Sequence, residues 1–375
     1  MTAAHETDRA VPVVLRTGRG DVAEEIRVLL DTESATVPVD GDIDWIVGNH
    51  EGSGFYRVAL GDDDLTVLAG RAAEVLSPLE RYGLVEDEWA LLLAGRGSIE
   101  RLLPLLRSLS GDDDLSVWRR IISVIAWFDR LVDDETRPAL QAWVRALLGP
   151  ALQALGPAKV EGEADRVTAL RAALALAVAT HGQDVRQREL ARQRFDAAGS
   201  SAGGADVDAD LADAAVKIVA TGADADTWEE IRRRANAAET AQDRLRHQGA
   251  LADADDPELV RRFCDLVLTD EIRTQDGLFL LRRALANRAA TTGVWAFVEG
   301  HWEEINRRFP SASVPRMLEG VRTVTDRTLA TRIAAFLADH PVPQGEQVIR
   351  QHQERMWVSV ALAERVSSDL RSALA

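Results

Sequence analysis

The 375-residue chain is 46% hydrophobic and 28% charged, which is enough apolar material for a large core and more length than one compact domain usually needs. Its formal net charge of -17 disfavours partners that need a basic surface, so neither nucleic acid nor an anionic membrane is expected to bind it. The single cysteine excludes an intramolecular disulfide, and no apolar run is long enough to span a membrane. The polar segment 1–8 is unlike a signal peptide, so the expected location is the cytoplasm.

The first sixty residues are predicted to form a β region. Short segments rich in β-branched and aromatic residues alternate with turns that contain Gly and Asp, as in antiparallel strands. About five strands barely make two covering layers, so this region is expected to be part of a β-sandwich. The expected strands cover residues 11–16, 25–30, 35–39, 45–49 and 54–60.

From residue 61 onward the hydrophobic pattern changes to a helical period and keeps it to the C-terminus. Glycine or proline separates many of the runs, and residues such as Ser98 and Asp326 precede them as N-caps do. The clearest helix covers residues 112–130, where large apolar side chains recur every three or four positions. They are Trp118, Ile121, Ile122, Ile125 and Phe128.

These runs predict roughly fifteen helices joined by short loops, too many for one bundle. Helix pairs stacked on pairs would bury each apolar face against a neighbour. The predicted fold class is therefore mainly α: a long α-helical superhelix, a degenerate HEAT- or armadillo-like array, preceded by the small β-sheet region. The Gly- and Ser-rich loop 199–204 is the one flexible stretch expected inside it. The expected divisions are a polar tail at 1–10, the β region at 11–60 and the helical domain at 61–375.

The histidines and the cysteine do not form a reaction centre. No H-E-x-x-H motif occurs, and His301 and Glu304, one helical turn apart, have no evident third ligand. Cys264 falls within a helical run without a paired histidine or cation, as a buried structural thiol does. No nucleophile elbow or phosphate-binding glycine loop occurs with the right flanks. The sequence therefore predicts no catalytic and no metal-binding residue.

Three acidic clusters look like metal sites but are expected to cap helices. Residues 62–64 and 112–114 stand immediately before helical runs, where carboxylates accept free N–H groups. Asp208 lies in a D-x-D-x-D run that begins like a calcium loop. However, Leu211 and Lys217 occupy the positions where that loop needs glycine and glutamate.

Several segments, taken in chain order, carry a family resemblance. WIVGN at 45–49 and GFYRV at 54–58 precede the helical domain, the run 240–276 contains TAQDRL and IRTQD, and WAFV at 295–298 precedes Trp302. Together they resemble the C-terminal domain of aminopeptidase N-type zinc metallopeptidases, as in the endoplasmic reticulum aminopeptidases, from about residue 11 to the C-terminus. The match departs locally, because Asp-Arg at 243–244 stands where the family often has an acid and a lysine.

The resemblance implies a non-catalytic regulatory or substrate-enclosing domain of a zinc aminopeptidase that removes N-terminal residues from peptides. The zinc helix of such enzymes lies upstream, so zinc is expected in the catalytic domain, no cofactor is expected in this chain, and the chain alone should be inactive. The implied partners are that catalytic domain and the peptide substrate. A second interpretation stays open: a stand-alone helical-repeat module that binds peptides or another protein. Adhesive β edges would favour the first interpretation, and a closed β unit the second.

Candidate contacts with the substrate or the catalytic domain come from two places. Tyr56 and Arg57 end the β region, where an arginine in an apolar strand is expected to form a buried ion pair. Arg273, Gln275 and Asp276 precede an apolar helix, which Asp276 is expected to cap, while Arg273 is expected to pair with a carboxylate. Two further candidates lie on the polar side of that helix: Arg283 and Asn287.

Overall fold

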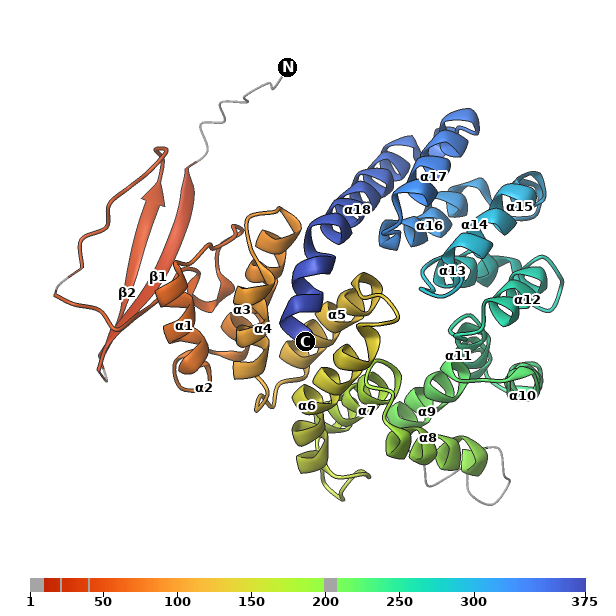
Figure 1. Ribbon diagram of the computed structural model, residues 1–375, viewed down its shortest axis with the longest axis horizontal. Helices are drawn as coiled ribbons and strands as arrows, with labels where there is room; N and C mark the ends of the chain where they lie inside the picture. Colours follow the sequence, from red (N-terminus) through yellow and green to blue (C-terminus); the bar gives the residue numbers. More distant parts are fainter. Residues whose placement is uncertain (1–9, 21, 40, 199–207) are drawn as a thin grey trace. The chain divides into compact units, whose positions relative to one another are not determined.

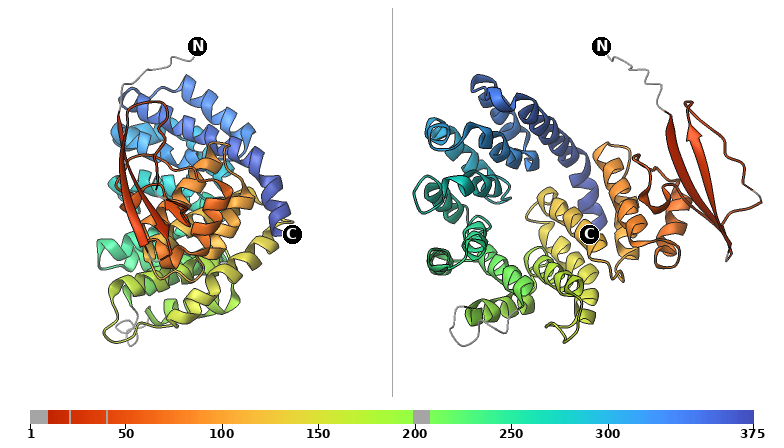
Figure 2. Two further views of the ribbon diagram at one scale, coloured as in Figure 1. Left: turned by 90° about the vertical axis from the view of Figure 1, so that its left-hand side faces the viewer. Right: turned by 180° about the vertical axis from the view of Figure 1, so that it is seen from behind.

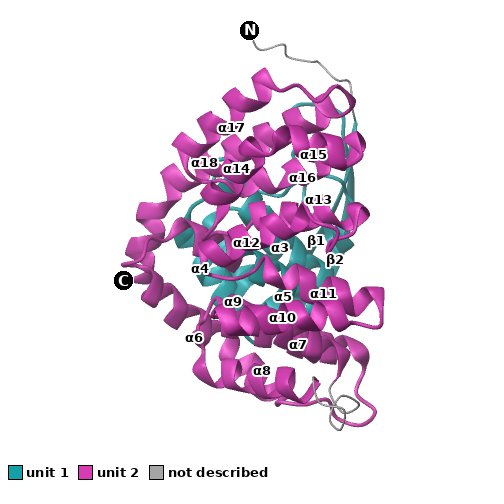
Figure 3. Ribbon diagram, turned by 90° about the vertical axis from the view of Figure 1, so that its right-hand side faces the viewer, with its two compact units in different colours: residues 1–124 teal, residues 125–375 magenta. Residues whose placement is uncertain are grey.

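The computed structural model describes residues 10–20, 22–39, 41–198 and 208–375 (Figure 1). Within these residues, eighteen α-helices follow a small antiparallel sheet, so the prediction of a mainly α protein is confirmed. The chain divides into two compact units, residues 1–124 (unit 1) and 125–375 (unit 2), which are coloured separately in Figure 3 and described separately below. The division between the units falls inside helix α5, Leu115–Leu131. It does not coincide with the change from strands to α-helices, because the first α-helix already begins at Asp62.

The sheet of unit 1 consists of β1 (Val11–Arg19), β2 (Val22–Leu30) and β3 (Trp45–Val47), in the order β2-β1-β3. Both pairs are antiparallel, and the hairpin register places Val13 opposite Val28 and Leu15 opposite Ile26. Strands expected at 11–16, 25–30 and 45–49 are therefore present, with different ends.

The strands expected at 35–39 and 54–60 are wrong, because neither segment is extended against a partner. The first contains Pro38, which cannot donate to a strand ladder. In the second, the Asn49 side chain takes both backbone bonds of Gly54: its Nδ2 donates to the Gly54 carbonyl (3.0 Å) and its Oδ1 accepts from the Gly54 N–H (2.9 Å). At Gly54 the side-chain amide of Asn49 thus takes the backbone groups that a partner strand would bind.

The hairpin leaves its apolar side chains incompletely covered. Val13, Leu15, Ile26 and Val28 lie on one face of the sheet, since paired residues of an antiparallel ladder share a face, and all four are only half-buried. On β2, which forms an edge of the sheet, Leu29 is 60% exposed. Within unit 1 the hairpin therefore leaves these apolar side chains only half-buried.

The helices of unit 1 supply its core. Helix α3 (Pro78–Leu93) begins with a capping box in which Ser77 and Glu80 exchange side-chain and backbone hydrogen bonds. It packs against α4 (Ile99–Ser108), where Leu102 and Leu106 are fully buried. The remaining helical elements of unit 1 are η1 (His50–Gly52), α1 (Asp62–Gly70) and α2 (Ala72–Val75).

Helix α5 begins where the acidic run 112–114 ends, because the Asp114 carboxylate accepts the N–H groups of Ser116 (2.7 Å) and Val117 (3.2 Å). Its predicted apolar stripe is buried: Trp118, Ile121, Ile125 and Phe128 have no exposed surface, and Ile122 is half-buried. In contrast, Asp62, Asp63 and Asp64 lie in the first turn of α1 and make no side-chain cap. The predicted capping role is thus confirmed at one of these two clusters.

The described residues of unit 2 form helices and the loops that connect them, without a strand. Successive helices pack on their neighbours, for instance α7 on α8 and α9, and α10 on α11 (Figure 2). Its core includes the fully buried Trp295, Phe263 and Leu281. The helices are α6 (Arg137–Leu155), α7 (Asp165–Thr180), α8 (Val185–Ala198), α9 (Ala209–Thr221), α10 (Ala225–Ala237), α11 (Ala241–Leu251), α12 (Pro257–Val267), α13 (Thr274–Leu285), α14 (Thr291–Gly300), α15 (Trp302–Arg308), α16 (Val314–Leu318), α17 (Arg327–Asp339) and α18 (Glu346–Leu374), with η2 (Ser311–Ser313), η3 (Glu319–Thr323) and η4 (Pro343–Gly345).

Caps start several of these helices as predicted. Asp326 accepts the Leu329 N–H at 2.7 Å at the start of α17, and Asp208 accepts the Asp210 N–H at 2.9 Å at the start of α9. Asp208 therefore caps a helix, as expected of the run that begins like a calcium loop. Residue 206 of that run and the loop expected at 199–204 lie outside the described residues.

The first and last parts of unit 2 are linked by polar contacts. The Arg130 guanidinium on α5 donates to the Ala286 carbonyl at the end of α13, and Arg371 on α18 pairs with Asp133 after α5. Helix α18 also packs against α6, as Figure 1 shows. Contacts between segments that are more than 150 residues apart therefore link the first helices of unit 2 directly to its later helices.

Candidate functional site

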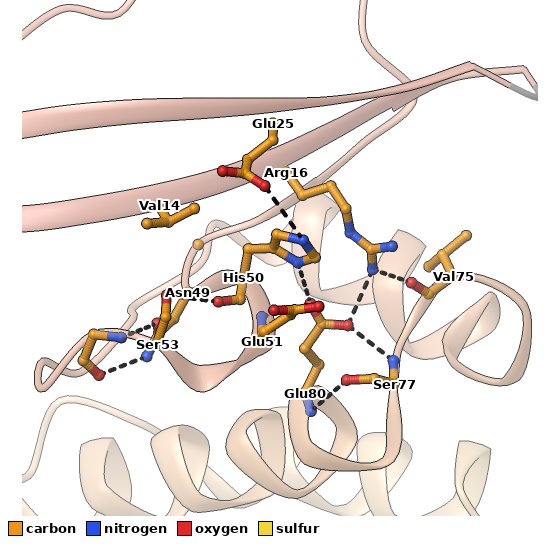
Figure 4. A network of polar contacts seen from close by, with 12 residues as sticks. Val14, Arg16, Glu25, Asn49, His50, Glu51, Ser53, Val75, Ser77 and Glu80 are labelled. Atoms are coloured by element: carbon orange, nitrogen blue, oxygen red, sulfur yellow. Dashed lines mark hydrogen bonds and ion pairs between the residues drawn. The ribbon is translucent and has the colours of Figure 1, made fainter.

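A carboxylate of unit 1 collects donors from the sheet, η1 and α3. The Glu80 side chain is 2% exposed and accepts from Arg16 Nη2 (3.0 Å) and from the backbone N–H groups of Ser77 (2.8 Å) and Glu51 (3.1 Å) (Figure 4). His50 Nδ1 lies 2.8 Å from its Oε1. Burial would raise the pKa of Glu80, but the contact with His50, the two N–H groups and the charge of Arg16 lower it below the ordinary value. This network joins the strand to the helices.

Tyr56, a predicted site residue, belongs to the same junction. Its hydroxyl donates to the Gly48 carbonyl at 2.9 Å and accepts from the Val14 N–H at 3.4 Å. The side chain is half-buried, and burial is the main reason that the pKa of Tyr56 is raised. The phenol therefore connects β1 to the segment after β3.

Arg57 does not form the buried ion pair that the sequence predicted. Its side chain is 55% exposed and pairs with Glu86 (2.8 Å) and Asp87 (3.3 Å) on α3. The prediction assumed that residue 57 lies in an apolar strand. Because no strand forms there, the guanidinium reaches the surface of the helix instead.

The predicted polar group at the start of α13 is only partly assembled. Arg273 occupies the N-cap position of α13 and is exposed, and within the described part of the chain it forms no ion pair. Asp276 lies in the first turn of the helix without making a side-chain cap. The expected pairing of Arg273 and the expected cap by Asp276 are therefore both wrong. Gln275 is exposed beside them.

The two other predicted residues hold α13 against the end of α11. Arg283 forms a fork with the Asp253 carboxylate, with Nε 2.6 Å from Oδ1 and Nη2 bonded to Oδ2. Burial would lower the pKa of Arg283, but its bonds with Asp253 raise it. Asn287 Nδ2 donates to the carbonyls of Ala252 and Ala254, both at 2.9 Å. These contacts position the backbone of the loop after α11.

A second ion network, around Asp129, was missed by the sequence analysis. The Asp129 carboxylate on α5 pairs with Arg137 of α6 and with Arg288 Nε (3.2 Å) beyond α13, and it lies 3.5 Å from His181 Nδ1. Burial would raise the pKa of Asp129, but His181 and the two arginines lower it. The available signal was a carboxylate next to Phe128, at the end of the apolar stripe of this helix, since a carboxylate beside a buried face needs partners.

Neither network contains a nucleophile poised for reaction. Cys264 has no exposed surface, and burial raises the pKa of its thiol to about 12, so the predicted structural role is confirmed. Across the ranges that the structure describes, no three His, Cys, Asp or Glu side chains are grouped as metal ligands. In the same ranges no helix is long and apolar enough to cross a membrane.

The chain has relatives among the aminopeptidases. A family model for the ERAP1-like C-terminal domain matches residues 45–356. Aminopeptidase M1-B of Oryza sativa subsp. japonica is 28% identical over 341 residues, which cover 88% of this chain and 38% of the rice protein. Aminopeptidase M1 of Arabidopsis thaliana is 26% identical over 341 residues, with the same coverage of 88% and 38%. Endoplasmic reticulum aminopeptidase 2 of Bos taurus is 23% identical over 317 residues, covering 81% and 32%.

A series of helices that follows a small sheet in the chain, matched over most of its length by one family model, defines a C-terminal helical domain of the aminopeptidase type. The chain belongs to the ERAP1-like C-terminal domain family. It spans less than half the length of the curated relatives that it matches.

Proposed function

We propose that this chain is the regulatory, substrate-enclosing domain of a zinc aminopeptidase that removes N-terminal residues from peptides. In this proposal a separate catalytic segment holds the zinc ion and cleaves the peptide, while the helical domain limits which peptides can enter. The family membership supports the proposal, because the relatives named above are aminopeptidases of more than twice the matched length.

The incompletely covered sheet of unit 1 is the observation that carries the proposal. Val13, Leu15, Ile26 and Val28 form an apolar face that the described residues of unit 1 leave half-exposed, next to the unpaired edge of β2. Such a face is stabilised by a second sheet packed about 10 Å away. We infer that strands of the catalytic segment supply this second layer, and that the partner is therefore the catalytic domain.

The test is reconstitution. The purified chain is mixed with a segment that carries the H-E-x-x-H motif from an aminopeptidase of the same source, and the mixture is assayed for hydrolysis of peptides of increasing length. We expect no hydrolysis by the chain alone, co-elution of the two parts, and a peptide-length preference that the catalytic segment lacks by itself. Val28→Asp should abolish co-elution because it places a charge on the apolar face.

Two charge reversals test the candidate contact residues. Arg57→Glu and Arg273→Glu should weaken the complex, because both side chains are exposed and each change reverses a charge at the surface. Arg233→Glu, an exposed position on α10, makes the same change of charge elsewhere and serves as the control. Co-elution unaffected by Val28→Asp would refute the sheet contact. If the chain is monodisperse and never binds the catalytic segment, the stand-alone interaction module replaces the proposal.

A further inference from the structure

A cavity of about 450 Å³ lies in unit 2 among α6, α7 and α8. It is lined by the C-terminal half of α6, by the turn at Gly156 and Pro157, by one face of α7 and by α8. These helices pack on one another in sequence order, so the cavity is formed by elements that are close in the chain. Its size is in the range of small-molecule sites.

Four arginines line this cavity, in a chain whose net charge is -17: Arg145, Arg171, Arg186 and Arg194. Asp184 is the single acidic residue of the lining. Its carboxylate accepts the Gln187 N–H at 2.9 Å and so caps α8, Val185–Ala198. The lining therefore carries a strong excess of positive charge.

Arg171 is held rigidly and is already neutralised. Its side chain is 1% exposed, its Nη1 lies 2.7 Å from the Glu163 carboxylate, and its Nη2 donates to the Leu155 carbonyl at 2.9 Å. Its Nε donates to the Gly156 carbonyl at 3.0 Å. These bonds fix the guanidinium as part of the cavity wall and leave it little freedom to rearrange.

The other three arginines have no carboxylate partner among the described residues. Arg145 donates to the Gly182 carbonyl and Arg194 to the Pro157 carbonyl, and these acceptors carry no formal charge. Arg186 has neither a hydrogen bond nor an ion pair within the described ranges. Burial and the nearby charge of Arg171 lower the pKa of Arg194, as expected where positive charges crowd together without a counter-ion.

Apart from two glutamines, the rest of the lining is apolar. Leu152 on α6, Ala175 and Val178 on α7, and Leu190 on α8 contribute to the wall. A ligand that fits this cavity therefore needs a charged head for the guanidinium groups and an apolar body for these side chains. Planar guanidinium forks match the oxygens of phosphate and carboxylate groups.

We propose that this cavity binds a small organic anion with a phosphate or carboxylate head and an apolar body, held by Arg145, Arg186 and Arg194. The anion supplies the negative charge that the described residues do not. This site is separate from the sheet face on which the proposed function rests, so either proposal can fail without the other.

Calorimetric titration of the full chain tests the proposal with three probes: phenyl phosphate, phenylacetate and inorganic phosphate. We expect saturable binding with one site per chain for at least one aromatic anion, and the stronger of the two identifies the head group. Inorganic phosphate should bind at least tenfold more weakly than phenyl phosphate, because it lacks the apolar body. Affinity should fall as salt is added.

Variants connect the binding to the cavity. Arg186→Ala removes a side chain that has no hydrogen-bond or ion-pair partner among the described residues, so the fold should persist, and it should weaken binding about tenfold or more. Arg194→Ala should have a similar effect. Arg233→Ala removes the same charge from the exposed surface of α10 and should leave the affinity unchanged. The proposal is overturned if neither aromatic anion binds saturably, or if Arg186→Ala and Arg233→Ala reduce the affinity equally.

Discussion

The hairpin of unit 1 and the central helices of unit 2 both contain many Leu, Ile and Val residues, but they bury them to different extents. On β1 and β2 every apolar side chain is half-buried or exposed. On α12, α13 and α14, Phe263, Leu281 and Val298 have no exposed surface. The helices cover one another's apolar side chains, whereas those of the hairpin all keep some exposure. The comparison indicates that the helices of unit 2 bury their apolar side chains among themselves, whereas the hairpin of unit 1 does not.

The same contrast holds for the polar networks. The Glu80 network connects the sheet to α3 in unit 1, and the Asp129 network connects α5 and α6 to the segment after α13 in unit 2. Both carboxylates have a lowered pKa because cationic and N–H donors outweigh the effect of burial. Four sets of substitutions test how far the two regions differ.

The largest difference is expected from the same substitution made in each region. Leu281→Ala removes a fully buried side chain of α13 and should lower the free energy of unfolding by about 2–5 kcal/mol. Leu29→Ala, at a position that is 60% exposed on β2, should change it by less than about 0.5 kcal/mol. Urea unfolding followed by far-UV circular dichroism measures both. Similar costs at the two positions would mean that the hairpin is as well covered as the helices.

Glu80→Gln should cost about 3 kcal/mol near neutral pH, because it leaves Arg16 and two buried N–H groups without their anionic acceptor. A carboxyl whose pKa is lowered by folding stabilises the protein above its unfolded pKa of about 4.3, and this contribution is lost as the pH falls through the folded pKa. The difference between parent and variant should therefore shrink below about pH 4.

Unfolding free energies measured from pH 7 to pH 3 test this expectation, with the exposed Glu24→Gln as the control. A difference between parent and Glu80→Gln that stays constant over this range would show that the carboxylate charge contributes nothing.

Asp129→Asn should cost about 2 kcal/mol, less than the Glu80 change because the Asp129 side chain is 21% exposed. Asp134→Asn provides a matched control, since Asp134 is also paired with Arg137, at 3.5 Å, but is fully exposed. Hydrogen exchange of the amides in α5 and in the segment after α13 should accelerate in the first variant only. Equal exchange in both variants would show that the network does not hold α5 against the segment after α13.

Arg57→Ala should have the smallest effect, under about 1 kcal/mol, because its ion pairs with Glu86 and Asp87 are exposed to solvent. The measurement is again urea unfolding, with Arg27→Ala on β2 as the control at a side chain that is 80% exposed. A loss of more than about 2 kcal/mol in the free energy of unfolding would instead indicate that Arg57 forms a buried ion pair, as the sequence predicted.

Much of the fold was readable from local patterns. The stripe from Trp118 to Phe128 predicted a buried helix because a 3.6-residue period places these side chains on one face. Asp208 and Asp326 were recognised as caps because a short acidic side chain reaches the N–H groups of the same turn. The two strands of the hairpin were recognised, with different ends, as short segments rich in β-branched residues on either side of a glycine-containing turn. All of these features depend on interactions between residues within a few positions of one another.

The tertiary structure decided the features that depend on distant residues. Segment 54–60 forms no strand, the backbone of Gly54 is bonded to the Asn49 side chain instead, and Arg57 reaches the surface of α3. The partners of Asp129 come from α6, from the end of α7 and from beyond α13, and the arginines of the cavity meet only when α6, α7 and α8 pack. Sequence determined the helices and the family, since these follow from local periodicity and residue order. Ion networks and cavities depend on which helix faces meet, and that is decided by packing between segments far apart in the chain.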